Sequence, residues 1–273
     1  DNLFLSSILA VDADTGEYRW HYQTTPRDRW DYTATQQIML ADLPLGEEGA
    51  DRRVVMQAPK NGFFYVLDAA DGELISATPF TNQNWTTGEF DENGRPVLIE
   101  EAVDLALYAV IPGPTGAHNW HPMAFNPDTG LVYIPVNEIP FFYDKTRNVE
   151  DSKSFWNIGY DAAAGWPVEY PAGTLDAVAD LDGGSLLAWD PVKAEPRWAV
   201  PFPLPLNGGV LSTDAGLVFQ GNKFGDLVAY DAETGERLWS HQLVGNAAAA
   251  PMTYEIDGEQ YLSVLSGWGS VSN

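Results

Sequence analysis

The sequence contains no cysteine in its 273 residues. This absence excludes a disulfide framework, a thiolate metal site and a haem-attachment motif within the segment. Uninterrupted apolar runs of about 18 residues are also missing, so no membrane-spanning helix is predicted. No window of about 15 residues keeps a 3.6-residue apolar period with helix caps, which excludes a fold built on long helices.

Basic residues are few, because 14 Lys and Arg stand against 39 Asp and Glu, a formal net charge of −25. A surface of that sign repels nucleic acid and anionic lipid, so neither is expected as a partner. Glycine, proline and aromatic residues are plentiful, with 25 Gly, 19 Pro, 10 Trp, 12 Tyr and 12 Phe. The frequent Gly and Pro indicate frequent turns between short elements.

An Asp-turn-Trp pattern recurs along the chain. The stretch "AVDADTGEYRW" from Ala10 to Trp20 matches "AYDAETGERLW" from Ala229 to Trp239 at Ala, Asp, Thr, Gly and Trp. Weaker copies read "VLDAADGELIS", "AFNPDTGLVYI" and "AWDPVKAEPRW". The anchors of the five copies lie 41 to 64 residues apart and are Asp12, Asp68, Asn126, Asp190 and Asp231. Periods of this size indicate a propeller or another repeat array.

Each copy has the composition of a β-hairpin, in which Asp and Gly make the turn between two strands. The returning strand ends in Trp20, Trp198 or Trp239 in three copies. Such a Trp can pack between neighbouring sheets and donate its indole N–H to the next unit, so we interpret these three as structural anchors between blades. We predict an all-β fold, a β-propeller of radially arranged four-stranded sheets, with roughly four to five blades in this chain. Residues 1–273 are predicted to form a single partial propeller domain, a fragment of a longer chain.

Three segments interrupt the repeat, and function is expected in them. The first, "PRDRWDYTATQQ", sets Asp28 and Asp31 around Trp30; the second, "QAPKNGFFYVLD", contains Lys60; the third, "PTGAHNWHPMAFNP", contains two of the four His. Local sequence leaves a simpler alternative for each, namely a surface turn capped by Asp, a solvated lysine, and a loop hydrogen-bonded by Asn119. The His-rich segment suggests a metal but has no third ligand nearby.

Together these segments resemble a known family. The similar stretches occur in family order and cover nearly the whole chain: "AVDADTGEYRWHYQTTPRDRWDYTATQ", "APKNGFFYVLD", "GAHNWHPMAFNP", "LNGGVLSTDAGLVFQGNKFGDLVAYDAETGERLW" and "AAAPMTYEIDGEQYLSVLSGWG". The chain resembles the C-terminal part of the propeller of the pyrroloquinoline-quinone-dependent alcohol dehydrogenases, of the quinoprotein or quinohaemoprotein type. The resemblance implies part of an eight-bladed propeller with tryptophan docking motifs.

The resemblance also implies roles for individual residues. Asp31 in "WDYT" matches the catalytic base, which lies near the bound metal ion, and its aromatic neighbours are expected to hold it in a partly dry pocket that favours proton uptake. Lys60 matches a cation at the carbonyl edge of the quinone, where it stabilises the reduced cofactor. Asn119 and Trp120 match contacts around the cofactor, and Trp268 in "SGWG" matches a residue lining the same pocket.

Other positions follow or depart from the family pattern. Lanthanide-using members carry a second Asp two positions after the catalytic acid, whereas this chain has Thr33, so the resemblance implies calcium. Leu206 stands where the family often has an aromatic residue, which reshapes the site. The family's other metal ligands, a Glu and an Asn, and its Trp floor under the quinone are expected upstream of Asp1. The long segment from Asn137 to Gly173 is expected to cap the substrate side.

The implied reaction is the oxidation of a small alcohol to an aldehyde or ketone, with the proton taken by Asp31 and the hydride by pyrroloquinoline quinone. A cytochrome c-type electron acceptor and a periplasmic location are implied with it. A non-catalytic periplasmic scaffold propeller that binds protein partners is the main alternative, because it would keep the docking tryptophans without needing Asp31, Lys60 and Asn119. A carbohydrate-active propeller with Asp28 and Asp31 as paired carboxylates ranks last, since acids three apart on one loop rarely face each other across a sugar.

Overall fold

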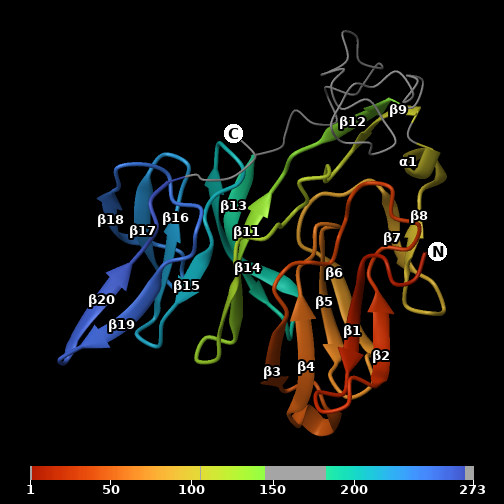
Figure 1. The fold of residues 1–273 in the computed structure, drawn as a ribbon, viewed down its shortest axis with the longest axis horizontal. Helices are drawn as coiled ribbons and strands as arrows, with labels where there is room; N and C mark the ends of the chain where they lie inside the picture. The colour runs from red at the N-terminus through yellow and green to blue at the C-terminus, as the bar shows by residue number, and fades with distance from the viewer. Residues whose placement is uncertain (1, 105, 145–182, 268–273) are drawn as a thin grey trace.

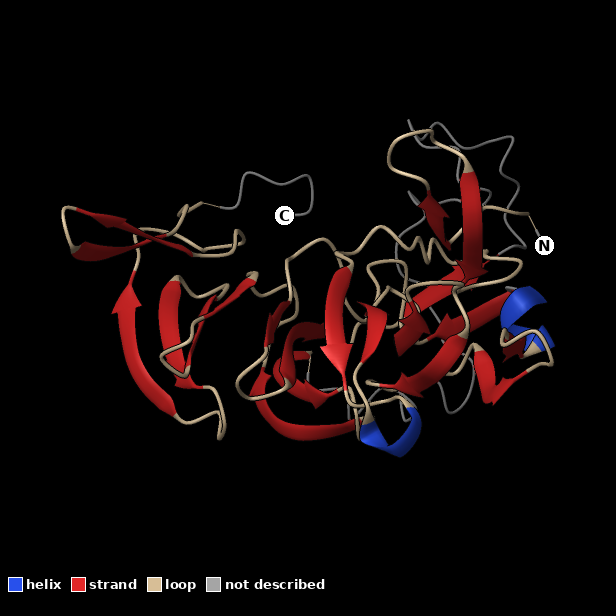
Figure 2. Cartoon of the chain, turned by 90° about the horizontal axis from the view of Figure 1, so that it is seen from below, coloured by secondary structure: helices blue, strands red, loops and turns tan. Residues whose placement is uncertain are grey.

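In the computed structural model, residues 2–104, 106–144 and 183–267 of the chain are described. Antiparallel strands make up most of this part, and sheets that follow one another in sequence lie next to one another in space (Figure 1). Helix among the described residues is confined to α1 (Glu100–Asp104) and a 3-10 turn at Glu47–Gly49 (Figure 2). None of the described helices is long and apolar enough to cross a bilayer. The predicted all-β class is therefore confirmed.

Three sheets have four strands each, with antiparallel neighbours throughout. The first contains β3 (Met39–Leu43), β4 (Arg52–Gln57), β5 (Phe63–Asp68) and β6 (Leu74–Pro79). The second contains β10 (Ala124–Asn126), β11 (Leu131–Asn137), β13 (Gly184–Asp190) and β14 (Glu195–Phe202). The third contains β15 (Val210–Ser212), β16 (Leu217–Gly221), β17 (Asp226–Asp231) and β18 (Arg237–Gln242).

Four two-stranded pairs complete the described fold. At its two ends lie β1 (Ser7–Val11) with β2 (Tyr18–Gln23), and β19 (Met252–Ile256) with β20 (Glu259–Ser263). Between the first and second sheets the chain forms β7 (Thr86–Phe90) with β8 (Pro96–Leu98), and β9 (Ala106–Val110), which pairs with β12 (Phe141–Asp144). These inserted pairs lie outside the repeat. Together with α1 they contribute to the same buried cluster as Trp30 and Tyr32 of the segment "PRDRWDYTATQQ".

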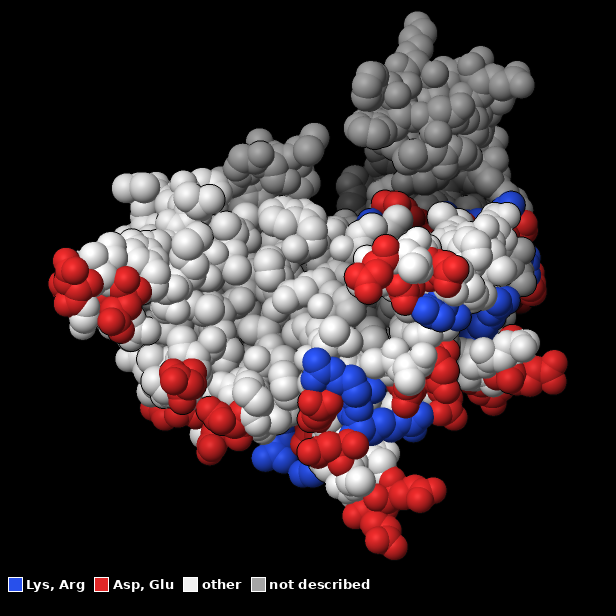
Figure 3. All heavy atoms as spheres, turned by 60° about the horizontal axis from the view of Figure 1, so that its bottom comes forward, with Lys and Arg blue, Asp and Glu red and all other residues white. Residues whose placement is uncertain are grey.

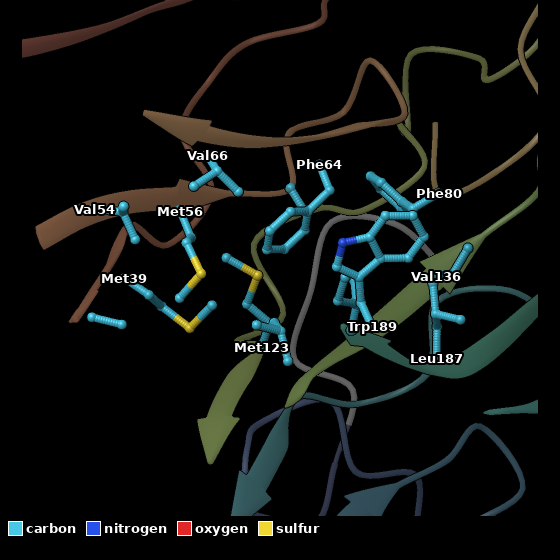
Figure 4. Packing of buried hydrophobic residues seen from close by; sticks show 14 of the residues in the cluster. Met39, Val54, Met56, Phe64, Val66, Phe80, Met123, Val136, Leu187 and Trp189 are labelled. Atoms are coloured by element: carbon cyan, nitrogen blue, oxygen red, sulfur yellow. The ribbon is translucent and has the colours of Figure 1, made fainter. Parts of the chain in front are cut away.

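The strands at the centre of a sheet bury both faces, which explains their unbroken apolar runs. In β5, alternate side chains point to opposite sides, so Phe63 and Tyr65 pack toward β1 and β2. Phe64 and Val66 pack toward the second sheet, where Phe64 meets Trp189 with ring centroids 5.8 Å apart (Figure 4). One strand thereby joins two inter-sheet cores.

The tryptophan docking motif is present between β2 and the first sheet. The indole N–H of Trp20 donates to the carbonyl oxygen of Ala69 at 3.2 Å, in the turn that follows β5. Gly72 of that turn lies flat against the indole, because a Cβ added there would stand 2.5 Å from the ring. Trp20 is only 8% exposed, as expected of an anchor between sheets.

Trp198 on β14 repeats this contact with the third sheet. Its indole N–H donates to Ala232 at 3.1 Å, and Gly235 lies against its ring. Trp239 is 47% exposed and stacks on His241 of its own strand, so its predicted role as an anchor stays a prediction. Among the described residues, no backbone carbonyl oxygen accepts the indole N–H of Trp239 as that of Ala69 accepts the indole N–H of Trp20.

One of the five repeat anchors belongs to a different kind of hairpin. Asp12, Asp68, Asp190 and Asp231 each lie in the turn before an outer strand, but Asn126 lies between β10 and β11, the first hairpin of the second sheet. Asn126 makes the same local turn, since its Oδ1 accepts the N–H of Asp128 at 2.8 Å. The same local turn therefore occurs in both kinds of hairpin, and Asn126 and Asp190 lie in one sheet.

The scarce basic side chains pair with acids of nearby hairpins. Figure 3 shows acidic and basic side chains next to one another on one face. Arg52 contacts Asp68 at 2.5 Å, and Arg19 contacts Asp12 at 2.7 Å. The Arg19 guanidinium, with hydrogen bonds from Thr15, lowers the pKa of Asp12 to about 2. These cations thus offset part of the acidic charge at the hairpin turns.

Candidate functional site

Two loops bring the predicted base and the predicted cation together. Residues 24–38 join β2 to β3 and carry Asp31, and residues 58–62 join β4 to β5 and carry Lys60. The Lys60 ammonium nitrogen lies 2.9 Å from Oδ2 of Asp31. The Lys60 side chain is only 9% exposed and that of Asp31 is 65% exposed, so the pair consists of a buried cation and an accessible carboxylate.

Asp31 is held outside by the burial of its neighbours. Trp30 and Tyr32 are completely buried, with ring centroids 5.4 Å apart. The indole of Trp30 donates to the carbonyl oxygen of Ala102 at 3.2 Å, and the Tyr32 hydroxyl donates to that of Pro112. These rings were expected to hold the carboxylate in a partly dry pocket, but in the described structure they are buried in the core while the carboxylate is 65% exposed.

The backbone of Asp31 has a φ of +65°, in the left-handed region. Few residues with a side chain adopt this conformation, although Asp and Asn tolerate it better than most. The turn allows both flanking rings to enter the core while the carboxylate stays at the surface. The acid between two aromatics is therefore the outer point of a strained turn.

A third buried ring connects the two loops. Trp85 lies 5.5 Å from both Trp30 and Tyr32, measured between ring centroids. Its indole N–H donates to the carbonyl oxygen of Asn61 at 2.9 Å, directly after Lys60. We call Trp30, Tyr32 and Trp85 the aromatic platform. Because the platform supports both loops, the distance between Asp31 and Lys60 is set by packing rather than by the ion pair alone.

The side chain of Asn61 fixes the Lys60 loop from within. It is fully buried and donates to the Thr24 carbonyl oxygen at 3.1 Å and to the Tyr65 hydroxyl at 2.9 Å. Asn61 thereby ties this loop to the end of β2, directly before the Asp31 loop.

Lys60 packs against a glycine of the His-rich loop. A Cβ on Gly116 would stand 2.3 Å from Cγ of Lys60 and 2.7 Å from its Cα. Gly116 has a φ of +80°, and the next residue, Ala117, donates its N–H to the Lys60 carbonyl oxygen at 2.9 Å. Only glycine allows this close approach, so the wall that confines the Lys60 stem depends on the absence of a side chain.

The His-rich loop is joined to the Lys60 loop by His118. Its Nδ1 lies 2.6 Å from the carbonyl oxygen of Ala58 and its Nε2 lies 2.7 Å from that of His121. Both ring nitrogens therefore face the backbone, and His118 acts as a buried brace between the loops. Burial lowers the pKa of His118. Burial also lowers the pKa of His121 to about 4, with His118 and Lys223 contributing in the same direction.

Asn119 and Trp120 lie in this braced loop. The Asn119 side-chain amide donates to the Thr115 carbonyl oxygen at 2.7 Å and accepts the N–H of Trp120 at 2.8 Å. Trp120 is half exposed and stacks on His121, with ring centroids 4.1 Å apart. The Asn119 amide therefore makes the hydrogen bonds within the loop that the simpler alternative to a cofactor contact predicted.

Two predicted features lie outside the described residues. They are Trp268 and residues 145–173 of the segment expected to cap the substrate side. Of that segment, β12 is described and pairs with β9. Within the described ranges, no group of three or more His, Cys, Asp or Glu is placed to hold a metal ion.

The family pattern described as "Glucose/ethanol/alcohol dehydrogenase, beta-propeller domain", of the PQQ class, matches residues 1–94 and 81–262. The chain belongs to this family. It is 50% identical over 279 aligned positions to the quinohemoprotein alcohol dehydrogenase ADH-IIG of Pseudomonas putida, covering 98% of this chain and 38% of that protein. It is 49% identical to the quinohemoprotein alcohol dehydrogenase ADH IIB of the same organism, covering 100% of this chain and 38% of that protein.

Solved structures agree with the family assignment. The quinohemoprotein alcohol dehydrogenase of Comamonas testosteroni superposes with a TM-score of 0.84 at 45% identity, over 98% of this chain and 39% of that one. The predicted partial propeller is therefore confirmed as a fold class. The chain spans somewhat over a third of the length of the curated relatives it matches.

The residues present fit the cofactors of this quinoprotein family. The Asp31 carboxylate is accessible, and carboxylate oxygens are the ligands that calcium prefers. Lys60 supplies a fixed positive charge next to it, suited to a quinone oxygen that becomes anionic on reduction. This part of the chain contributes a single carboxylate, so the remaining ligands must come from other residues or from the quinone.

Proposed function

We propose that the full-length protein oxidises small alcohols to aldehydes or ketones with pyrroloquinoline quinone and calcium. The observation that supports this proposal is the contact of 2.9 Å between Lys60 and Asp31, held on one aromatic platform. A surface ion pair without a role would not need three buried rings beneath it. The family match adds the expectation of quinone-dependent chemistry.

Asp31 is the general base in this proposal. Its carboxylate is the accessible member of the pair and can accept the hydroxyl proton of an alcohol in contact with it. When bound, the quinone supplies the hydride acceptor and calcium supplies a Lewis acid beside it. The platform keeps the carboxylate at a fixed point, so that proton removal needs no rearrangement of the loop.

Lys60 is the electrostatic partner. Its stem is confined by Gly116, so its ammonium group stays where negative charge is expected to develop. A lysine with this little freedom can donate a hydrogen bond without first losing side-chain entropy. Asn119 and Trp120 remain proposed cofactor contacts, carried on the loop that His118 braces against the Lys60 loop.

Calcium is proposed rather than a lanthanide because Thr33 follows Asp31 at the second position. The Thr33 hydroxyl lies 3.4 Å from that of Thr35, a contact within the loop. A hydroxyl adds no negative charge, so the site suits a divalent ion better than a trivalent one. A cytochrome c-type electron acceptor and a periplasmic location complete the proposal.

The test is reconstitution of the cofactor-free full-length protein with pyrroloquinoline quinone and Ca²⁺. We expect alcohol-dependent reduction of a dye acceptor that requires both additions. The exchange Asp91→Ala, in the β7–β8 hairpin, is the control variant and should behave as wild type. Binding of quinone without oxidation of any primary or secondary alcohol would contradict the proposal, and failure to bind quinone would favour the scaffold alternative.

A further inference from the structure

We propose that Asp28 is a positioning residue that holds Asp31 in its working conformation; this rests on the proposed function of Asp31 as base. Oδ1 of Asp28 accepts the backbone N–H of Trp30, the residue directly before Asp31, at 2.9 Å. The Asp28 side chain therefore binds the backbone where the turn of Asp31 begins. The two acids of "DRWDY" thus have different tasks.

The conformation of Asp31 requires such support. A φ of +65° is unfavourable for a residue with a side chain, and the N–H of Trp30 belongs to a fully buried residue. A buried N–H without an acceptor is strongly unfavourable. Asp28 supplies that acceptor in the observed arrangement, in which the Asp31 carboxylate lies at the surface.

Asp28 is itself attached to the body of the sheet. Its Oδ2 accepts the hydroxyl of Ser6 at 2.9 Å. The Ser6 carbonyl oxygen in turn accepts the backbone N–H and the hydroxyl of Thr24, both at 2.8 Å. The chain of contacts runs from β2 through Ser6 and Asp28 to the turn that carries Asp31.

Loss of this acceptor releases the turn. Once the Trp30 N–H is no longer held, Asp31 can return to an ordinary φ, and its carboxylate moves away from Lys60. The ring anchors at Ala102 and Pro112 remain, so the surrounding core is retained. The effect is therefore expected on the position of Asp31 rather than on the fold.

A graded series in the full-length enzyme, loaded with quinone and calcium, tests the proposal. Asn keeps an acceptor oxygen, Ser makes the same turn more weakly, and Ala removes the acceptor. We expect Asp28→Ala to lower kcat roughly 10²-fold with KM little changed, since a misplacement of about 1 Å costs that much. Asp28→Asn should stay within about tenfold of wild type, and Asp28→Ser should lie between them.

The second readout does not depend on turnover. Acetylation of Lys60 is measured by mass spectrometry in the cofactor-free full-length protein, with Lys193, which lies 3.8 Å from Asp190, as the internal standard. Asp28→Ala should label Lys60 about two to five times faster, the range expected for loss of a partly exposed ion pair. The matched control is Asp91→Ala, which removes two backbone caps, from Asn93 and Arg95, at the tip of the β7–β8 hairpin and should change neither readout.

Two results would overturn the proposal. One is wild-type kcat and wild-type Lys60 labelling in Asp28→Ala, or in Asp28→Ser where the Ala variant does not fold. The other is an Asp28→Asn variant as slow as Asp28→Ala, which would assign the effect to charge instead of the acceptor. If Asp31 is not the base, acetylation of Lys60 still shows whether Asp28 holds Asp31 against Lys60. Failure of the proposed function is therefore distinguished from failure of the proposed role of Asp28.

Discussion

The docking contact between Trp20 and Gly72 makes a quantitative prediction. Trp20 is 8% exposed, so Trp20→Ala should lower the free energy of unfolding of the full-length protein by about 3–5 kcal/mol. Gly72→Ala should also destabilise, although it adds atoms. Its φ of +77° costs about 1–2 kcal/mol with a side chain, and a Cβ 2.5 Å from the indole adds an overpacking cost of about 1–3 kcal/mol.

The double variant separates the two contributions. Without the indole, the added Cβ meets empty space, so Gly72→Ala should cost only the backbone strain in the Trp20→Ala background. The expected coupling energy is about 1–3 kcal/mol. Gly16→Ala is the matched control, because Gly16 has a φ of +73° with nothing within 4 Å of an added Cβ. It should cost only about 1–2 kcal/mol.

The assay is urea denaturation followed by far-UV circular dichroism, which does not depend on the fluorescence of the removed tryptophan. The m-value should be unchanged, so that the midpoints report stability. Additive effects of Trp20→Ala and Gly72→Ala, within about 0.5 kcal/mol, would refute the docking argument. So would a Gly16→Ala variant as unstable as Gly72→Ala.

Three further predictions concern the site. Lys60→Met keeps the stem against Gly116 and removes the charge, so turnover should fall while the melting temperature stays within a few degrees; the reverse pattern would make Lys60 structural. Burial lowers the pKa of His121 in the folded protein from 6.5 to about 4, so between these pH values the unfolded chain binds more protons than the folded one. Acidification from pH 6.5 to pH 4 should therefore lower the free energy of unfolding by up to about 1.4 kcal/mol per pH unit. His121→Phe should reduce this pH dependence when denaturation is compared at pH 7 and pH 5. An unchanged slope would contradict the burial argument. Metal-free enzyme should regain turnover with Ca²⁺, whereas strong activity with La³⁺ and none with Ca²⁺ would overturn the role given to Thr33.

The fold was largely predictable because its signals are local. The turn residues and the strand runs on either side of Asp12 or Asp231 contain all that a hairpin needs. Docking by Trp20 and Trp198 followed from their repeated position and the need of an indole N–H for an acceptor. Which hairpin of its sheet Asn126 belongs to could not be predicted, because the same turn chemistry serves two different hairpins of one sheet.

The site was only partly predictable, since it is made by tertiary contacts. Asp31 and Lys60 could be named from the family resemblance, but their contact joins two loops through rings at Trp30 and Trp85. No repeat or spacing marked Trp85, which lies in the inserted part of the chain. The positioning role proposed for Asp28 could not be predicted from the sequence either, because a surface turn capped by Asp and a turn that positions a base have the same local sequence.

The central claim is that Asp31 takes the proton of the alcohol. It is tested most directly by the rate at which alcohol reduces bound quinone in full-length Asp31→Asn, followed by stopped flow after quinone and calcium contents are confirmed. A general base contributes about 10²–10⁴-fold, so the fully loaded variant should be slower than wild type by about that factor. A rate near that of wild type at full loading would contradict the account.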